Sequence, residues 1–220
     1  MKNAYFMNAL GAIVFGISSV NGMEIPDAEA KEQKKLFVAF AIPNEQKGDP
    51  ARELATYAKK IQDATKNHMQ KAGLVFNPLS AGKMHLTLFD APVDASSVVG
   101  VVEITQQAMR DFANAKQTVL GNPFSNIQVG MVNRMSNSIG VPISGAGNQK
   151  AQHVASMINT AAQNASLPYV GHISIGRIKL ATQQPGAPTS REEKDKIEAV
   201  LYNNPHIMQA IQAVPAPKIG

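Results

Sequence analysis

Cysteine and tryptophan are both absent from this chain of 220 residues, and aromatic residues make up only 5% of it. Without cysteine there can be no disulfide framework, no thiolate metal site and no cysteine nucleophile. So few aromatic rings leave little material for a platform that stacks planar ligands. The composition therefore excludes disulfide-rich scaffolds, thiolate zinc proteins and thiol enzymes.

The overall composition is that of a soluble globular protein, with 44% hydrophobic and 17% charged residues. A chain of this length can form one sizeable domain or two small lobes around a core that needs no staples. The formal net charge is +5, and the basic residues are scattered along the chain. This charge favours anionic partners such as nucleic acid or nucleotides, with an ordinary solvated surface as the alternative.

The N-terminus differs from the rest of the chain. Lys2 precedes the apolar segment "ALGAIVFGISSV" at residues 9–20. An apolar core of about a dozen residues is too short for a bilayer, which needs about 20, but suits a secretory signal peptide. We therefore expect a signal peptide over residues 1–22, with small residues Val20 and Gly22 near the cut, and a secreted or periplasmic protein. The alternatives are an N-terminal helix and a cytoplasmic location.

Beyond a charged linker at 23–34, strand and helix patterns follow one another through a domain at 35–213, which a flexible tail at 214–220 closes. The patterns predict strands at 35–43, 84–90 and 171–180, helices at 49–73, 93–116, 148–165 and 191–204, and a hairpin of 124–132 with 137–144 around the turn "NRMS". This mixture predicts an α+β fold with helices packed outside antiparallel or mixed sheets. In a two-lobed arrangement, the strands at 84–90 and 171–180 would face each other across a cleft.

Those two strands carry the same short pattern. In "GKMHLTLFD" (82–90), His85 is followed by Thr87, and in "VGHISIGRI" (170–178), His172 is followed by Ser174. In a strand, side chains two positions apart share one face and lie about 6.6 Å apart along it. A single such histidine is typical of an ordinary solvated strand. Two such patterns of a histidine followed two positions later by Thr or Ser are expected by chance in only on the order of one in a hundred chains of this composition.

Two histidines and two hydroxyls suit phosphoryl transfer without a metal. One neutral imidazole can take a proton while a second, protonated imidazole gives one, because the ordinary imidazole pKa is about 6.5. The hydroxyls can donate hydrogen bonds to the non-bridging oxygens of the phosphate. No carboxylate stands beside either histidine, which disfavours a zinc or iron site. We therefore expect no metal and no cofactor.

The paired "HLTL" and "HISI" resemble the two H-x-[ST]-x signatures of the 2H phosphoesterase superfamily. The longer stretches "KKLFVAFAIPNE", "KMHLTLFDAPVD" and "LPYVGHISIGRIK" are similar to its LigT-like branch, the RNA 2′,3′-cyclic phosphodiesterases also called 2′-5′ RNA ligases. The resemblance implies a bilobal fold in which two antiparallel sheets frame a central cleft. It further implies that His85 and His172 are the catalytic acid and base, and that Thr87 and Ser174 hold the phosphate.

The resemblance implies a metal-independent phosphodiesterase, a hydrolase acting on 2′,3′-cyclic phosphate ends of RNA or nucleotides. A phosphodiesterase of 2′-5′ oligoadenylate or cyclic oligonucleotides is an alternative, and a non-catalytic protein that binds nucleotides or RNA ends is another. The expected partners are RNA ends or small nucleotides. A monomer with no stable membrane insertion after processing is also expected.

Several other residues are candidates for lesser roles. Tyr169 and Phe89 are candidates for stacking on a base, although core packing is the ordinary role of an aromatic beside a strand. Arg177 falls on the face opposite His172 if the strand is regular, which predicts a charge at the rim of the site. The remaining histidines, His68, His153 and His206, sit in helical patterns and are interpreted as surface or capping residues. The glycine-rich "SGAGNQK" at 144–150 is interpreted as a loop and helix cap.

Overall fold

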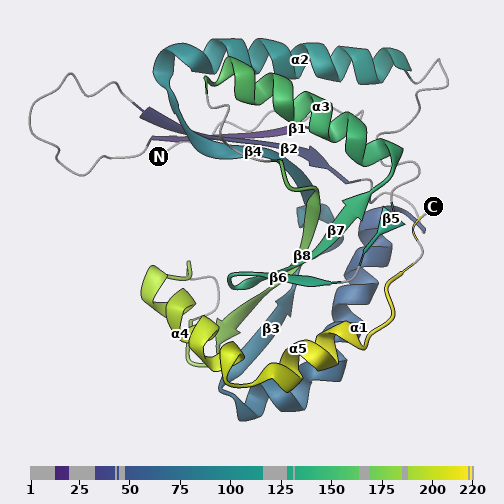
Figure 1. Ribbon diagram of the computed structural model, residues 1–220, viewed down its shortest axis with the longest axis vertical. Helices are drawn as coiled ribbons and strands as arrows, with labels where there is room; N and C mark the ends of the chain where they lie inside the picture. Colours follow the sequence, from purple (N-terminus) through teal and green to yellow (C-terminus); the bar gives the residue numbers. More distant parts are fainter. Residues whose placement is uncertain are drawn as a thin grey trace, which may run out of the picture. The chain divides into compact units, whose positions relative to one another are not determined.

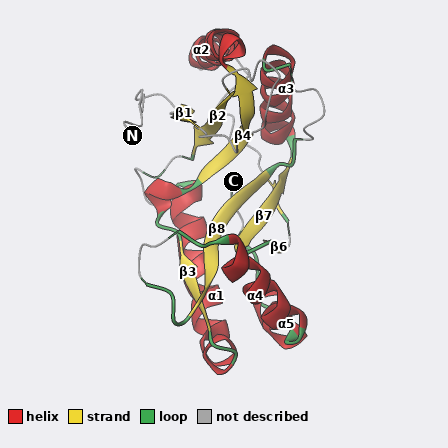
Figure 2. Cartoon of the chain, turned by 90° about the vertical axis from the view of Figure 1, so that its left-hand side faces the viewer, coloured by secondary structure: helices red, strands yellow, loops and turns green. Residues whose placement is uncertain are grey.

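The computed structural model describes residues 13–19, 33–42, 44, 48–115, 128–130, 132–163, 169–184, 188–217 and 219. The chain divides into two compact units, one of residues 1–42, 85–127 and 144–171, and the other of residues 43–84, 128–143 and 172–220. Each unit combines antiparallel strands with α-helices (Figures 1 and 2). The α+β class expected from the sequence is confirmed.

In the first unit, three strands pair in antiparallel order: β1 (Ile13–Ser19), β2 (Gln33–Ala41) and β4 (His85–Asp94). Two helices belong to the same unit, α2 (Val98–Ala115) and α3 (Ala146–Ala161), and a short 3-10 turn, η2 (Ala95–Ser97), precedes α2. Helix α3 packs against both α2 and β4. The core of this unit is apolar, and Leu36, Val38 and Leu86 are among its most buried side chains.

Strand β1 was not expected, because its residues lie inside the segment interpreted as a signal peptide. It pairs with β2 along its whole length, from Ile13 opposite Phe40 to Ser19 opposite Lys34. The rest of the expected peptide, residues 1–12 and 20–22, lies outside the described residues, as does most of the expected linker. The signal peptide stays a prediction.

The second unit is built on the long helix α1 (Pro50–Lys71), which lies against β3 (Leu74–Pro78). Strand β3 pairs antiparallel with β8 (His172–Leu180), and β8 also pairs antiparallel with β7 (Ser138–Ser144). The short strands β5 (Gln128–Val129) and β6 (Asn133–Met135) both neighbour β7. A 3-10 turn, η1 (Ala81–Lys83), leads out of the unit toward β4.

Helix α1 has the ends that its sequence predicts. Asp49 is the N-cap and Pro50 occupies the first turn, where a missing N–H costs nothing. Gly73, two residues beyond the last helical residue, has a φ of 68°. Glycine adopts this left-handed conformation without a steric penalty, so the chain turns here directly into β3.

The expected hairpin differs at its turn. Strand β5, inside the expected first arm, neighbours β7, while residues 124–127 and 131 of that arm lie outside the described residues. Residues 133–135, expected as part of a turn, form β6 and pair with β7 around a two-residue loop at Ser136 and Asn137. Ser136 has a φ of 54°, which a tight two-residue turn requires. The carbonyl of Asn137 accepts a hydrogen bond of 2.7 Å from the N–H of Ile178 in β8. This tertiary hydrogen bond holds the turn at residues 136–137, about two residues after the centre of the polar run "NRMS" at 133–136.

Two elements of this unit were missed. Strand β3 has only five residues, in which buried Leu74 and Phe76 alternate with exposed Val75. So short an alternation is a weak signal, and the strand is recognised by its pairing with β8. Helix α4 (Arg191–Tyr202) was expected to be the last helix, but α5 (Pro205–Gln212) follows it. Pro205 cannot continue α4, yet it suits the first position of a new helix.

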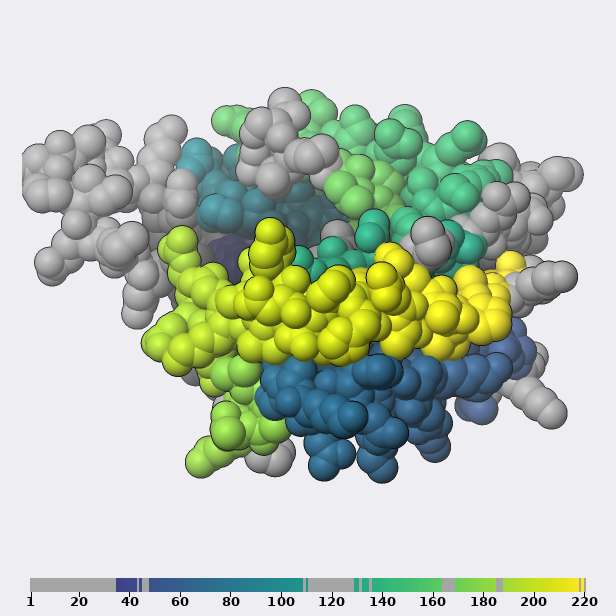
Figure 3. Space-filling model, turned by 60° about the horizontal axis from the view of Figure 1, so that its bottom comes forward, coloured from purple at the N-terminus to yellow at the C-terminus, as the bar shows by residue number. Residues whose placement is uncertain are grey.

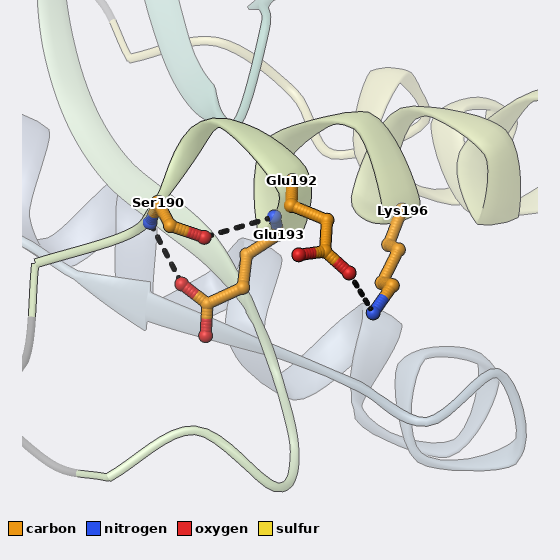
Figure 4. Close-up of polar contacts among 4 residues, drawn as sticks. All are labelled: Ser190, Glu192, Glu193 and Lys196. Carbon is orange, nitrogen blue, oxygen red and sulfur yellow. Dashed lines mark hydrogen bonds and ion pairs between the residues drawn. The ribbon is translucent and has the colours of Figure 1, made fainter.

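The N-terminus of α4 is closed by a capping box (Figure 4). The Ser190 hydroxyl accepts a hydrogen bond of 3.2 Å from the N–H of Glu193, and the Glu193 carboxylate accepts one of 2.7 Å from the N–H of Ser190. One turn on, Lys196 forms an ion pair of 2.7 Å with Glu192. This pair lowers the pKa of Glu192 and raises that of Lys196.

Among the described helices, none has the length and apolar character needed to cross a bilayer.

Replacing Gly176 of β8 by alanine should destabilise the protein. An added Cβ would overlap the ring of Phe76 and lie 3.0 Å from the carbonyl oxygen of Asn77. Because Phe76 is buried and cannot swing away, we expect Gly176→Ala to lower the free energy of unfolding by about 1–3 kcal/mol in urea denaturation. Gly100 in α2 has open space around it, so Gly100→Ala is the control and should be neutral or stabilising. Equal stability of Gly176→Ala and the wild type would refute this packing argument.

Candidate functional site

The first signature begins β4. His85 is its first residue, and His85 and Thr87 are both half-buried, while Leu86 and Leu88 between and after them are fully buried. Apolar side chains thus anchor one face of the strand in the core. The imidazole and the hydroxyl lie on the opposite face, as the spacing predicts.

A β-bulge follows the hydroxyl of this signature. Ala39 of β2 lies opposite Thr87, but the preceding Val38 lies opposite Phe89, so Leu88 is an extra residue in β4. An inserted residue reverses the alternation of the side chains that follow it. On β2, the alternate residues Phe37, Ala39 and Ala41 share one face, and their partners are Asp90, Thr87 and His85. Asp90 therefore lies on the face of His85.

The second signature begins β8 in the same way. His172 is the first residue of the strand, and His172 and Ser174 are half-buried, while Ile173 and Ile175 are fully buried. The order of buried and accessible residues is identical in β4 and β8 over seven consecutive positions, from each histidine onward. The two signatures thus share a local structure as well as a sequence pattern.

The second signature also contains a bulge at the same position. Gly140 of β7 lies opposite Ser174, and Ile139 lies opposite Gly176, so Ile175 is the extra residue. Its carbonyl accepts a hydrogen bond of 2.8 Å from the N–H of Leu79, just beyond β3. In both strands the bulge is the third residue after the histidine. Bulges are over-represented at sheet edges and next to active sites, where they redirect side chains.

The bulges change the expected places of two residues. Arg177 was expected on the face opposite His172, but its partner Ser138 shares a face of β7 with the partners of Ser174 and His172. The extra residue has therefore moved Arg177, which is exposed, onto the face of His172. Phe89, a candidate for base stacking, is only 3% exposed. The bulge at Leu88 turns this ring into the core, so it presents no stacking surface.

Small residues lie opposite both hydroxyls. Thr87 faces Ala39 and Ser174 faces Gly140 in the neighbouring strands. Directly opposed side chains have Cβ atoms only about 4.5–5.5 Å apart, so a large side chain there would cover the hydroxyl. Alanine and glycine leave each hydroxyl room for a further hydrogen-bond partner. No pattern in the two signatures themselves indicated these positions.

Phe37 and Lys35 of β2 complete the face that carries His85. The rings of Phe37 and His85 have centroids 5.2 Å apart and stand at 88°, an edge-to-face contact that favours one orientation of the imidazole. Lys35 forms an ion pair of 3.1 Å with Asp90. This pair offsets the negative charge of Asp90 on the face that carries His85. Both β2 residues could have been found from the alternation of 35, 37, 39 and 41, once the pairing with β4 was known.

Tyr169 lies in the segment that leads into His172. Its hydroxyl donates a hydrogen bond of 2.9 Å to Oδ1 of Asn148, in the first turn of α3. A Cβ at Gly171 would overlap the same oxygen, so any larger residue there would displace the amide of Asn148. The segment expected to be a loop and helix cap thus supplies Asn148, which holds the approach to the second signature. Tyr169 thus makes a positioning contact, whereas the sequence suggested base stacking or core packing.

Burial raises the pKa of Tyr169 above its ordinary value. The folded chain therefore keeps this phenolic proton at pH values where the unfolded chain loses it. The resulting stability is complete below about pH 10 and is lost as the pH rises further.

Replacing Tyr169 by phenylalanine should make the alkaline loss of stability less steep. At neutral pH, the variant should lose about 1 kcal/mol, because Oδ1 of Asn148 loses its donor. Urea unfolding from about pH 8 to about pH 11 measures both effects. Tyr202, 84% exposed, is the matched control, and Tyr202→Phe should follow the wild type. A wild-type alkaline slope in Tyr169→Phe would contradict the prediction.

No protein-family model matches this chain, and no curated protein matches it. Among solved structures, that of Kluyveromyces marxianus Usb1 with uridine monophosphate is similar. The two chains are 14% identical, the match covers 84% of this chain and 89% of that one, and the TM-score is 0.45. A likeness at this level assigns neither a family nor an activity to the chain.

Proposed function

We propose that this protein is a metal-independent phosphodiesterase that opens 2′,3′-cyclic phosphate ends of RNA or nucleotides. His85 and His172 are the acid–base pair, and Thr87 and Ser174 bind the phosphate. The observation that carries the proposal is the shared local structure of the two signatures. Each begins its strand, each presents an imidazole and a hydroxyl on one accessible face, and each has a bulge at the third residue after the histidine.

In the proposed reaction, water attacks the phosphorus of the cyclic phosphate. One neutral imidazole takes a proton from this water as the new P–O bond forms. The bond between phosphorus and the 3′ oxygen breaks, and the second, protonated imidazole gives its proton to that oxygen. The resemblance implies a product that carries the 2′-phosphate. The hydroxyls of Thr87 and Ser174 donate hydrogen bonds to the non-bridging oxygens, where charge develops.

Arg177 supports an anionic substrate. The bulge at Ile175 aligns its side chain with the face of His172 and Ser174, and the residue is exposed. A guanidinium can bind a phosphate through two parallel hydrogen bonds. We propose that Arg177 binds a phosphate of the substrate that does not itself react, such as the neighbouring one in an RNA chain.

We also propose that the protein is exported and acts in a secreted or periplasmic location. The support is the apolar segment at residues 9–20 and its small residues near the expected cut. Mass spectrometry of the protein recovered from the native host distinguishes a cleaved chain from one that keeps residues 1–22. A mature N-terminus at or near Met23 supports export, and a chain that retains residues 1–22 contradicts it.

Replacing either histidine by alanine should remove most of the turnover of 2′,3′-cyclic AMP, by about 10²–10⁴-fold each. Each loss follows because one proton transfer then lacks its donor or acceptor. Rates are measured with the full chain in excess chelator, and 2′-5′ oligoadenylate serves as a second substrate. His153→Ala is the matched control, since His153 is an exposed histidine on α3, and it should retain full activity.

Three outcomes decide the proposal. Turnover of 2′-5′ oligoadenylate alone would move the substrate to that linkage. Tight nucleotide binding without turnover, unchanged in His85→Ala and His172→Ala, would indicate a non-catalytic binding protein. A folded wild-type chain that leaves both substrates untouched would refute the phosphodiesterase assignment.

Replacing Arg177 by alanine should raise the KM for a dinucleotide that ends in a cyclic phosphate by about tenfold, the equivalent of one charge-assisted hydrogen bond. The kcat should change little, because the proposed contact is to a phosphate that does not react. For 2′,3′-cyclic AMP, which has no second phosphate, the KM should stay close to that of the wild type. Arg191, an exposed residue at the start of α4, provides the control Arg191→Ala. A KM effect of equal size on both substrates would exclude this role.

A further inference from the structure

Two histidines outside the proposed catalytic pair meet on the surface of the second unit. We propose that His68 of α1 and His206 of α5 form a binding site for a divalent cation of the Zn²⁺ class. The sequence suggested only surface or capping roles for these residues, since they stand 138 positions apart in separate helical patterns. Their ring centroids are 5.1 Å apart.

This separation fits two imidazoles that share one ion. A zinc-bound imidazole has a Zn–N distance of about 2.0–2.1 Å, which places its ring centroid about 3.2 Å from the metal. Two such rings at the tetrahedral angle have centroids about 5.2 Å apart. The rings of His68 and His206 are also tilted by 59°, so they are not stacked face to face. Both residues are exposed, so their side chains can rotate between rotamers to direct one nitrogen of each ring at a common ion.

The backbones that carry the two histidines are held together by packing. Helix α5 crosses α1 and packs against it (Figures 1 and 3), and it buries Ile207 and Ile211 within the second unit. Just beyond α5, the carbonyl of Val214 accepts a hydrogen bond of 3.2 Å from the hydroxyl of Tyr57 in α1. The histidine pair is therefore preorganised, and little backbone ordering is required when an ion binds.

The ligand set selects the class of ion. Within the described residues, no group of three or more His, Cys, Asp or Glu side chains is placed to hold a metal. The two imidazoles are thus the protein ligands of this site, and water completes the coordination shell. Imidazole suits Zn²⁺, Ni²⁺ and Cu²⁺, whereas Mg²⁺ and Ca²⁺ prefer oxygen ligands. Lys71 lies in the last turn of α1 with His68, and its positive charge lowers the affinity of the site for a cation.

A bound ion would link α5 to α1 at the surface, in addition to the apolar contacts below. Because the folded state brings the two rings together and the unfolded chain does not, Zn²⁺ should stabilise the second unit in proportion to its binding. The site involves neither β4 nor β8, so it is independent of the proposed phosphodiesterase chemistry. That reaction is tested in chelator, so the two proposals fail separately.

The experiment is a calorimetric titration of the full chain, prepared without a histidine tag, with ZnCl₂. We expect the affinity of one Zn²⁺ site to fall at least tenfold in both His68→Ala and His206→Ala, because a single imidazole cannot chelate. His153→Ala is the matched control, an exposed helical histidine outside the pair, and should bind as the wild type does. Thermal unfolding followed by circular dichroism should show a rise in Tm with Zn²⁺ in the wild type and in His153→Ala only.

A ligand exchange separates coordination from a merely structural effect. His206→Cys supplies a thiolate, which also binds Zn²⁺, and should restore binding, whereas His206→Asn should not. The chain has no other cysteine, so the thiolate can be assigned from the charge-transfer absorption of bound Co²⁺. Absence of Zn²⁺ binding to the wild type overturns the proposal. So does Zn²⁺ binding that is equally strong in the wild type, His68→Ala and His206→Ala.

Discussion

One extra residue in each of β4 and β8 determines which side chains the candidate site can use. Before the bulges at Leu88 and Ile175, the alternation of the strands places a histidine and a hydroxyl on one accessible face. After the bulges the alternation is reversed, so Asp90 lies on the face of His85 in β4 and Arg177 on the face of His172 in β8. Regular strands would have left these charges on the core side, where an unpaired charge is costly to bury. The bulges therefore reconcile a continuous apolar core with a polar face that contains more than two residues.

The packing around each signature is consistent with the same constraint. Alanine and glycine lie opposite the two hydroxyls, and Phe37 contacts the ring of His85 edge-on. Leading into the second signature, the chain is held where Tyr169 bonds to Asn148, and glycine at 171 leaves room for that bond. Phe37, Ala39 and Gly140 belong to neighbouring strands, and Asn148 belongs to a helix. The surroundings of each signature thus include residues far from it in the sequence.

The histidine pair on α1 and α5 illustrates how proximity in the fold gives residues a possible role. His68 and His206 have no hydroxyl or carboxylate neighbour at signature spacing, so each by itself is an ordinary exposed histidine. The packing of α5 on α1 brings the centroids of their rings to 5.1 Å from each other. The proposed cation site follows from that packing, while the proposed phosphodiesterase chemistry follows from the two strands.

The sequence by itself determined the α+β class, helix α1 with its proline start and glycine stop, and the two strands in which His85, Thr87, His172 and Ser174 share accessible faces. Local periodicity and end signals suffice for these features, since they depend on residues close together in the chain. Only the tertiary structure decided that β6 is a strand, that Phe89 is buried and that Arg177 lies on the face of His172. Strand pairing and bulges depend on the register between distant segments, and no local pattern specifies that register. The contact of His68 with His206 has the same origin, because it arises only where two helices pack.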